Sequence, residues 1–351
     1  MMNTALFLLA AILALRAIEW ARYRNQVEAA RCIAQRDIAA LVRPSDPWFQ
    51  VIAMACAWLE IGLGLVLADG LPPALGAVLA APFIAGRFRA LQEIGHTALH
   101  LGFGHRKQLQ WRIADWLGNF WLFKGNSRTR FQGHCVEHHP QANTEDDPNI
   151  QRLRAIGFVP GLPRQRFRAF LLHPVTPAGL AETARLYRHA LGHGAEPLIR
   201  LALQGMALAA LGTGFGGWAC VAWLLALGVV YPLFSWWSLL AEHRWFAEGD
   251  RHSRLLHDCA VTPRTTYSGL AAVLMRYFIS PCTDSRHLAH HVYPRLHWHY
   301  LHLADRHLEQ HEPAYRVHTR TSLFGRGALS ILAELESRFV VPTVEAVNHV
   351  D

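Results

Sequence analysis

The sequence predicts an all-α integral membrane protein in which two transmembrane hairpins carry a helical domain on the cytoplasmic side. Three observations lead to this fold class. Hydrophobic residues make up 52% of the 351 residues and charged residues only 17%. The apolar residues gather in runs long enough to cross a bilayer, which takes about 20 residues. The 34 Lys and Arg fall in three stretches, at 16–43, at 87–200 and from Arg244 onward.

Four apolar runs form the two predicted hairpins. Residues 69–73 join the first pair and residues 214–217 join the second, and neither link is long enough to hold a domain. Each pair must therefore begin and end on the same side of the membrane. The runs are Val51 to Asp69, Pro73 to about Leu91, Leu198 to Gly214 and Trp218 to Leu240.

A fifth apolar run, Ala5 to Leu15, precedes the hairpins. It is short for a span, so it could also be an interfacial anchor or the apolar part of a signal sequence. Arg16, Glu19 and Arg22 follow at once in place of a small-residue cleavage site. We therefore expect the segment to be retained, as a span or as an anchor.

The basic residues predict the orientation. By the positive-inside rule, the three basic stretches are cytoplasmic. The formal net charge of +8 then reflects a surface that faces anionic lipid, and no nucleic-acid partner is expected. The six cysteines contain no C-x-x-C pair and most of them lie on the reducing side or within spans, so disulfides are not expected.

The chain shows no internal repeat and no low-complexity tract, so neither a solenoid nor a disordered linker is indicated. Between Pro140 and Pro197 it is basic and interrupted by prolines, which predicts loops and short helices. The expected organisation is an N-terminal anchor and cytoplasmic segment at 1–50, a membrane and catalytic domain at 51–308 and a cytoplasmic tail at 309–351.

Eight of the 22 histidines fall into three short clusters. In the first cluster, two histidines four residues apart share one face of a helix that continues out of the second span. The other clusters each combine a pair at helical spacing with an adjacent ring. The clusters are His96 and His100; His134, His138 and His139; and His287, His290 and His291.

This pattern predicts a metal centre. In a chain this rich in histidine, an H-x-x-x-H pair arises about once by chance. The two three-histidine patterns arise together by chance in only about one such chain in a hundred. Imidazole binds iron, copper, nickel and zinc, and one ion takes at most about six ligands, so eight or nine histidines imply two ions. The alternative is a set of ordinary histidines at a membrane interface.

The order H-x3-H, H-x3-H-H, H-x2-H-H, interleaved with two hairpins, resembles the membrane fatty-acid desaturase superfamily from about Val51 to Leu308. Two further segments support the resemblance: Thr144-Glu145-Asp146-Asp147-Pro148 and His291-Val292-Tyr293-Pro294. It implies that the eight clustered histidines bind a catalytic di-iron centre, with His243 as a further ligand. Some members place an Asn where this chain has Leu239; Glu242 could serve instead, or the coordination differs.

The resemblance implies an oxidoreductase that uses O2 to remove two adjacent hydrogens from a fatty-acyl chain. Hydroxylation or ketolation of a lipid, a carotenoid or another apolar metabolite is the alternative within the superfamily. A metal transporter is the alternative from another class, but transport needs polar ligands near the bilayer midplane. The predicted spans offer only Glu60 there.

The electrons for such an oxidation must come from outside the chain. The sequence has no His-Pro-Gly-Gly haem segment, no Fe–S cysteine pattern and no G-x-G-x-x-G fingerprint. We therefore expect a separate donor of the ferredoxin, rubredoxin or cytochrome type. An acidic donor would dock on the basic cytoplasmic face.

Acidic residues near the clusters are candidates for orienting the ligand rings by accepting their free N–H groups. These candidates are Glu93, Glu137, Asp147, Glu242 and Asp284. The remaining histidines, which include His105, His252, His257, His297 and His299, are expected to bind no metal directly.

Overall fold

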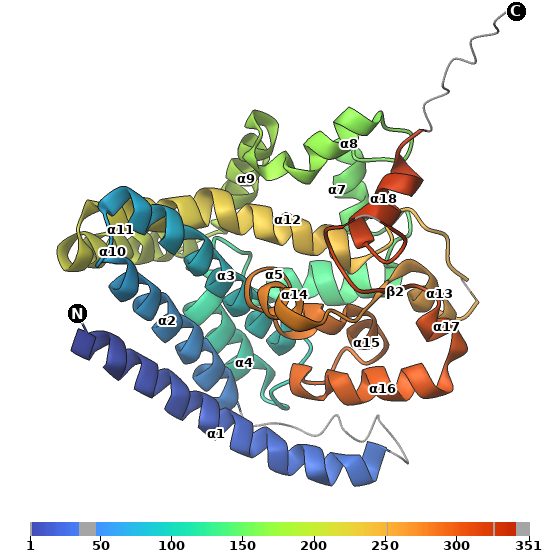
Figure 1. Cartoon of the computed structure of the whole chain (residues 1–351), viewed down its shortest axis with the longest axis horizontal. Helices are drawn as coiled ribbons and strands as arrows, with labels where there is room; N and C mark the ends of the chain where they lie inside the picture. Colours follow the sequence, from blue (N-terminus) through green and yellow to red (C-terminus); the bar gives the residue numbers. More distant parts are fainter. Residues whose placement is uncertain (1, 35–46, 251, 326, 342–351) are drawn as a thin grey trace, which may run out of the picture.

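The computed structural model describes residues 2–34, 47–250, 252–325 and 327–341, with side chains only to residue 24 in the first range. The chain is mostly helical, and its elements are arranged as in Figure 1. The longer helices are α1 (Met2–Ala34), α2 (Trp48–Ala68), α3 (Pro73–Leu99), α9 (Pro177–Ala190), α10 (Glu196–Phe215), α11 (Gly217–Leu225), α12 (Tyr231–Glu242) and α16 (Leu301–His311).

Short helices fill most of the remainder. Residues 140–197 contain short helices and loops as predicted, and also the longer α9. They are α4 (Lys107–Ala114), α5 (Ser127–Phe131), α6 (His139–Gln141), α7 (Pro148–Ala155), α8 (Arg164–Leu171), α13 (Arg254–Val261), α14 (Gly269–Leu274), α15 (His287–Val292), α17 (Pro313–Arg316) and α18 (Ile331–Phe339). Two strands of two residues, β1 (Arg264–Thr265) and β2 (Thr319–Arg320), pair in parallel. Segments with π-helical turns are η2 (Asp115–Asn119), η3 (Gln132–His138), η5 (Ala226–Val230) and η6 (Met275–Ile279).

Five helical stretches among the described residues are long and apolar enough to cross a membrane. Three of the four predicted runs lie within them, and the fourth, Val51 to Asp69, extends one residue past Trp48–Ala68, so the four apolar helices are confirmed. The N-terminal stretch extends well beyond the predicted Ala5 to Leu15. The five stretches are Met2–Arg24, Trp48–Ala68, Pro73–Leu99, Glu196–Phe215 and Gly217–Glu242.

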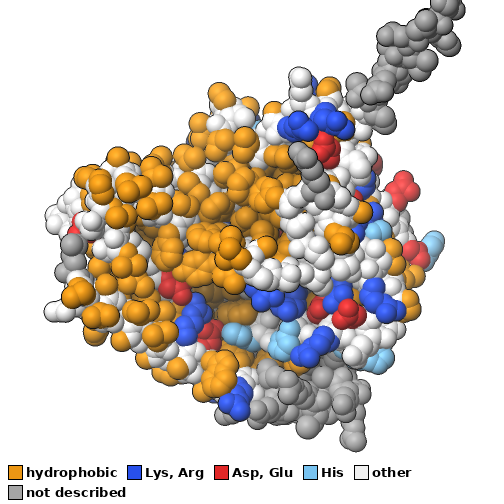
Figure 2. Space-filling model, viewed as in Figure 1, with side chains coloured by type: hydrophobic (Ala, Val, Ile, Leu, Met, Phe, Trp, Pro, Cys, Tyr) orange, Lys and Arg blue, Asp and Glu red, His pale blue; other side chains and the backbone are white. Residues whose placement is uncertain are grey.

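The apolar helices pack side by side. α2 packs against both α1 and α3, α11 and α12 pack against α3, and α10 packs against α11. Large apolar side chains point outward from this layer; Phe7 is 70% exposed and Leu198 is 72% exposed. Figure 2 shows apolar side chains covering the surface over α1, α2, α10 and α11, while charged side chains gather over α15 to α18. Such a broad apolar surface fits a membrane protein.

A buried ion network joins three of these helices. Glu60 of α2 lies 2.7 Å from Arg87 Nη1 of α3 and 3.0 Å from Arg16 Nη2 of α1. The sequence alone left Glu60 without an obvious partner. Its carboxylate is paired because the helix packing brings two arginines, distant in sequence, to the same point.

A second apolar core lies beside α12, away from the core between the long apolar helices. It contains Phe158, Phe167, Trp236 and Phe339. Because Phe339 belongs to α18, the described part of the predicted C-terminal tail contributes to this core. The domain boundaries at 50 and 308 stay a prediction.

Candidate metal centre

The clustered histidines lie at the ends of helices. His96 is in the last turn of α3 and His100 directly follows the helix, whereas His243 directly follows α12. η3 and α6 carry the second cluster, and α15 carries the third. The fold thus brings together histidines that are as much as 195 residues apart in sequence.

All nine predicted ligands meet, and they divide into two groups. Within each group, one ring nitrogen of every residue lies within 4.8 Å of the corresponding nitrogens of the others. The five-histidine group is His96, His100, His134, His139 and His290. The four-histidine group is His138, His243, His287 and His291.

The second and third clusters each contribute to both groups. His134 and His139 are five residues apart but face the same group, because the π-helical turn of η3 is wider than an α-helical turn. His138, between them in sequence, faces the four-histidine group. In α15, His287 and His291 are four residues apart and share that group, while His290 faces the other.

Ring nitrogens approach one another closely inside each group. His134 Nε2 lies 2.6 Å from His96 Nε2 and 3.0 Å from His139 Nε2. In the four-histidine group, His243 Nε2 lies 3.3 Å from the Nε2 atoms of His138 and His287. A proton on one ring nitrogen can form a hydrogen bond within only one such pair. Ring nitrogens that converge in this way are therefore suited to binding one shared metal ion.

Several of these nitrogens have no hydrogen-bond partner among the described residues. Both nitrogens of His290 and both of His291 are buried and unpartnered. Leaving a buried polar atom without a partner costs about 1–3 kcal/mol. Four unpartnered ring nitrogens in two adjacent residues are what metal ligands without their cation would show. The donor set therefore fits the metal centre that the sequence predicts.

Burial favours the neutral form of most of these rings. It lowers the pKa of seven of the nine histidines, and repulsion between neighbouring imidazoles adds to the effect; the pKa of His243 falls to about 3. Neutral imidazole is the form that binds metal. The other six are His100, His134, His139, His287, His290 and His291.

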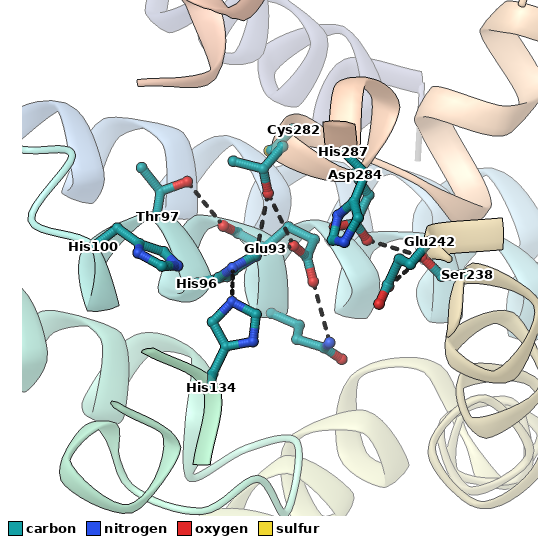
Figure 3. Close-up of polar contacts among 12 residues, drawn as sticks. Glu93, His96, Thr97, His100, His134, Ser238, Glu242, Cys282, Asp284 and His287 are labelled. Carbon is teal, nitrogen blue, oxygen red and sulfur yellow. Dashed lines mark hydrogen bonds and ion pairs between the residues drawn. The ribbon is translucent and has the colours of Figure 1, made fainter. Parts of the chain in front are cut away.

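Side chains outside the two histidine groups orient three of the predicted ligand rings through the Nδ1 atom. The carboxylate of Glu93 lies 2.7 Å from His96 Nδ1, as Figure 3 shows. Asp147 Oδ1 lies 3.0 Å from His138 Nδ1. Thr262 Oγ1 lies 3.0 Å from His243 Nδ1. Each contact fixes which ring nitrogen remains free to face the metal.

The other predicted acids do not hydrogen-bond a ligand ring among the described residues. Asp284 lies 3.9 Å from His287 Nδ1, and Ser238 donates to it at 2.9 Å. Glu242 accepts from the same Ser238 at 3.3 Å, so it turns toward the Asp284 side of the site (Figure 3). Glu137 is exposed and accepts from Gln132.

Two orienting residues were not predicted from the sequence. Thr262 Oγ1 contacts His243 Nδ1, and Thr283 Oγ1 lies 3.2 Å from His96 Nδ1. Neither residue lies in a motif that marks it. Asp258 Oδ1 lies 3.6 Å from His291 Nδ1, too far for a hydrogen bond. The histidines expected to bind no metal directly lie outside both groups, including the exposed His105 and His252.

One of three comparisons with known proteins finds a match. A family model described as fatty acid desaturase matches residues 69–322, which is more than half of the chain and includes all nine histidines. No curated protein matches the chain, and no solved structure matches it.

Proposed function

Since the chain belongs to the fatty acid desaturase family, we propose that this oxidoreductase is a membrane enzyme with two non-haem irons that uses O2 to introduce a C=C bond into a fatty-acyl chain. The observation that carries the proposal is the division of nine histidines into two buried groups whose ring nitrogens converge. Two groups of this size suit two ions, since one ion takes at most about six ligands.

Each group would hold one iron. When bound, the two ions would supply the O2-dependent oxidation of an unactivated C–H bond. The chain's own residues hold the rings in place: Glu93, Asp147 and Thr262 each fix one imidazole through Nδ1. Burial of the rings excludes bulk water from the centre, and the surrounding helices would position the substrate chain so that one carbon reaches the oxidant.

Hydroxylation or ketolation of a lipid, a carotenoid or another apolar metabolite is the alternative outcome at the same centre. The two outcomes differ in the product. A desaturated product has lost two hydrogens, whereas a hydroxylated one has gained an oxygen atom that derives from O2. Mass spectrometry of products formed under 18O2 distinguishes them.

Metal transport is less well supported. Glu60, the acid that the sequence placed near the middle of a predicted span, is paired with Arg16 and Arg87. A carboxylate held by two arginines is a poor ligand for a cation that must enter and leave. Both histidine groups instead lie where helices end, which suits a fixed centre.

We further propose that the apolar helices span the membrane, with the histidine groups on the cytoplasmic side. The electrons would come from a separate ferredoxin-, rubredoxin- or cytochrome-type donor that docks on the basic face. Turnover with an acidic donor should then slow as ionic strength rises, because salt screens the attraction. A rate that does not depend on salt would remove this docking proposal.

The deciding experiment is metal analysis of protein purified in detergent after expression with ample iron. We expect about two irons per chain, as the two groups require. A double variant, His138→Ala with His290→Ala, removes one donor from each group and should lose the iron. One zinc per chain, or no metal, would contradict the di-iron proposal.

A further inference from the structure

A cleft of about 310 Å³ lies outside the two histidine groups. It is formed by α9, the beginning of α12, and the segment between α4 and α5. Aromatic and basic side chains alternate around it, among them Lys124, Arg130, Arg152, Tyr187, Tyr231 and Trp236. The Lys124 ammonium lies 5.3 Å from the centre of the Tyr231 ring.

The cleft holds more positive charge than its acidic groups neutralise. Among the described residues that line it, Glu182 is the one carboxylate, and it already pairs with Arg152 at 2.8 Å and with His173 at 2.8 Å. No described carboxylate lies within 4.0 Å of Lys124 or Arg130. Arg130 donates to the neutral amide of Asn119. Partly buried cations without acidic partners favour an anion.

We propose that this cleft binds the anionic end, a carboxylate or a phosphate, of a molecule with an apolar chain. Two basic groups, Lys124 and Arg130, and aromatic walls in one small cleft match the two halves of such a molecule. The binding site stands on its own. The inference that the molecule is the substrate of the centre rests on the proposed function and restricts that substrate to acidic amphiphiles.

The cleft lies close to the histidine groups. The hydroxyl of Tyr231, in its wall, donates to Gln92 at 2.6 Å, and Gln92 donates to Glu93 at 3.1 Å. Glu93 in turn holds His96. The wall of the cleft is therefore connected through Gln92 to Glu93, which orients the predicted ligand His96. A molecule whose charged end binds in the cleft lies close to this connection.

The surroundings of the cleft suit the lipid headgroup level. Helix α9 exposes Leu180 and Leu186 together with the basic Arg185 and Arg188, which is typical of an amphipathic helix at a membrane surface. Tyr187 of the same helix donates to the carbonyl of Leu227, within the last apolar stretch. An amphiphile could enter this cleft directly from the bilayer.

The amine of Lys124 can serve as a probe of this site, because the chain contains few lysines. Of its 34 basic residues only two are lysines, Lys107 and Lys124. Burial, followed by repulsion from Arg130, Arg89 and Arg152, lowers the pKa of Lys124 to about 7. A bound anion acts in the opposite direction and typically raises such a pKa by about 1–3 units. Occupancy should therefore convert Lys124 from a reactive amine into an ammonium.

The test is amine acetylation by a limiting amount of an N-hydroxysuccinimide ester at pH 7, on the full chain in nanodiscs of phosphatidylcholine. Peptide mass spectrometry measures the extent of acetylation at Lys124, and acetylation at Lys107 is the internal control. We expect hexadecanoate and hexadecyl phosphate to lower labelling of Lys124 by about fivefold or more, with less than about a twofold change at Lys107. Nanodiscs containing phosphatidylglycerol test whether a bilayer lipid supplies the anion instead.

Three results would overturn the proposal: equal protection by hexadecanol, which has the chain but no charge; equal protection by inorganic phosphate, which has the charge but no chain; or no protection by any anionic amphiphile. In support, Lys124→Met should weaken hexadecanoate binding about tenfold or more, whereas Lys124→Arg and Lys107→Met should not. None of these measurements requires iron or turnover, so failure of the di-iron proposal would be seen separately.

Discussion

The Asp147 carboxylate accepts hydrogen bonds from three groups. Oδ1 receives the backbone N–H of Asn149 and His138 Nδ1, and Oδ2 receives the backbone N–H of Asn143. The first of these bonds caps the N-terminus of α7. Burial would raise the pKa of Asp147, but the contact with His138 and the bond from Asn143 outweigh it and lower that pKa. One ionised side chain thus fixes both a helix and a predicted ligand.

Asp147→Asn separates these two roles. Asn caps helices about as well as Asp, so the fold should persist, but the neutral amide orients His138 less firmly. We expect the affinity for iron to fall about 10- to 100-fold, measured as the iron retained against a graded chelator. Asp146→Asn, at an exposed neighbouring position, should retain iron normally. Equal retention in both variants would show that Asp147 does not support a ligand.

Single ligands should be indispensable. His138→Ala and His290→Ala each remove one donor from a different group. Each should lower turnover at least about 100-fold and reduce bound iron, while the protein still inserts in the membrane. Iron analysis and membrane fractionation measure the two effects, and the exposed His105→Ala serves as the control. Unchanged iron in both ligand variants would contradict the assignment.

At the scale of elements, the helices that enter the metal centre are fixed by polar contacts inside the apolar layer. α3 is held to α2 and α1 through Arg87, Glu60 and Arg16, and Arg87 also lies over the ring of Tyr277 in η6. Because His96 lies in the last turn of α3 and His100 directly follows the helix, these contacts help to set the position of two predicted ligands.

Glu60→Gln should therefore destabilise the protein. It leaves Arg87, which is 3% exposed, without its carboxylate, and breaking a buried ion pair costs about 3–5 kcal/mol. We expect a clear fall in the thermal midpoint in detergent. A double variant, Glu60→Gln with Arg87→Met, should recover part of that loss. Asp69→Asn, at the turn after α2, is the control, and an unchanged midpoint for Glu60→Gln would show that the network is not stabilising.

At the scale of the whole molecule, the centre lies where the apolar helices meet the short helices of the polar part. The buried histidines that gather there make the folded protein less stable at acidic pH. Burial lowers the pKa of at least seven of them, and of His297 beside α1. In the unfolded chain these groups titrate near 6.5, so below that pH the unfolded chain binds protons that the folded chain does not.

The metal-free protein should consequently lose stability as the pH falls from 7 to 5. The contribution is fully present above about pH 6.5 and is lost as the pH falls toward the lowered folded-state values. Burial raises the pKa of Asp258 and Asp284, which acts in the opposite direction, but the histidines outnumber them. Unfolding midpoints measured in chelator at several pH values test this, and equal midpoints at pH 7 and pH 5 would contradict it.

Much of the fold and of the candidate site followed from local patterns. The apolar helices were predictable because length and hydropathy are properties of continuous segments. The eight clustered histidines stood out because their spacing is local, and Glu93 and Asp147 were candidates because they lie within nine residues of the rings they contact. Thr262 and Thr283 were not predictable, since nothing in their own segments distinguishes them from ordinary polar residues.

The sequence by itself thus determined the apolar helices, the family and the set of residues available to bind metal. Only the tertiary structure decided how those residues are shared, with five histidines facing one point and four facing another. That division depends on the π-helical turn of η3 and on the spacing of the three histidines along α15. The tertiary structure also decided that Glu60 is paired with two arginines, whereas Lys124 has no carboxylate within 4.0 Å among the described residues. Both outcomes depend on which distant side chains the packing brings within a few ångströms.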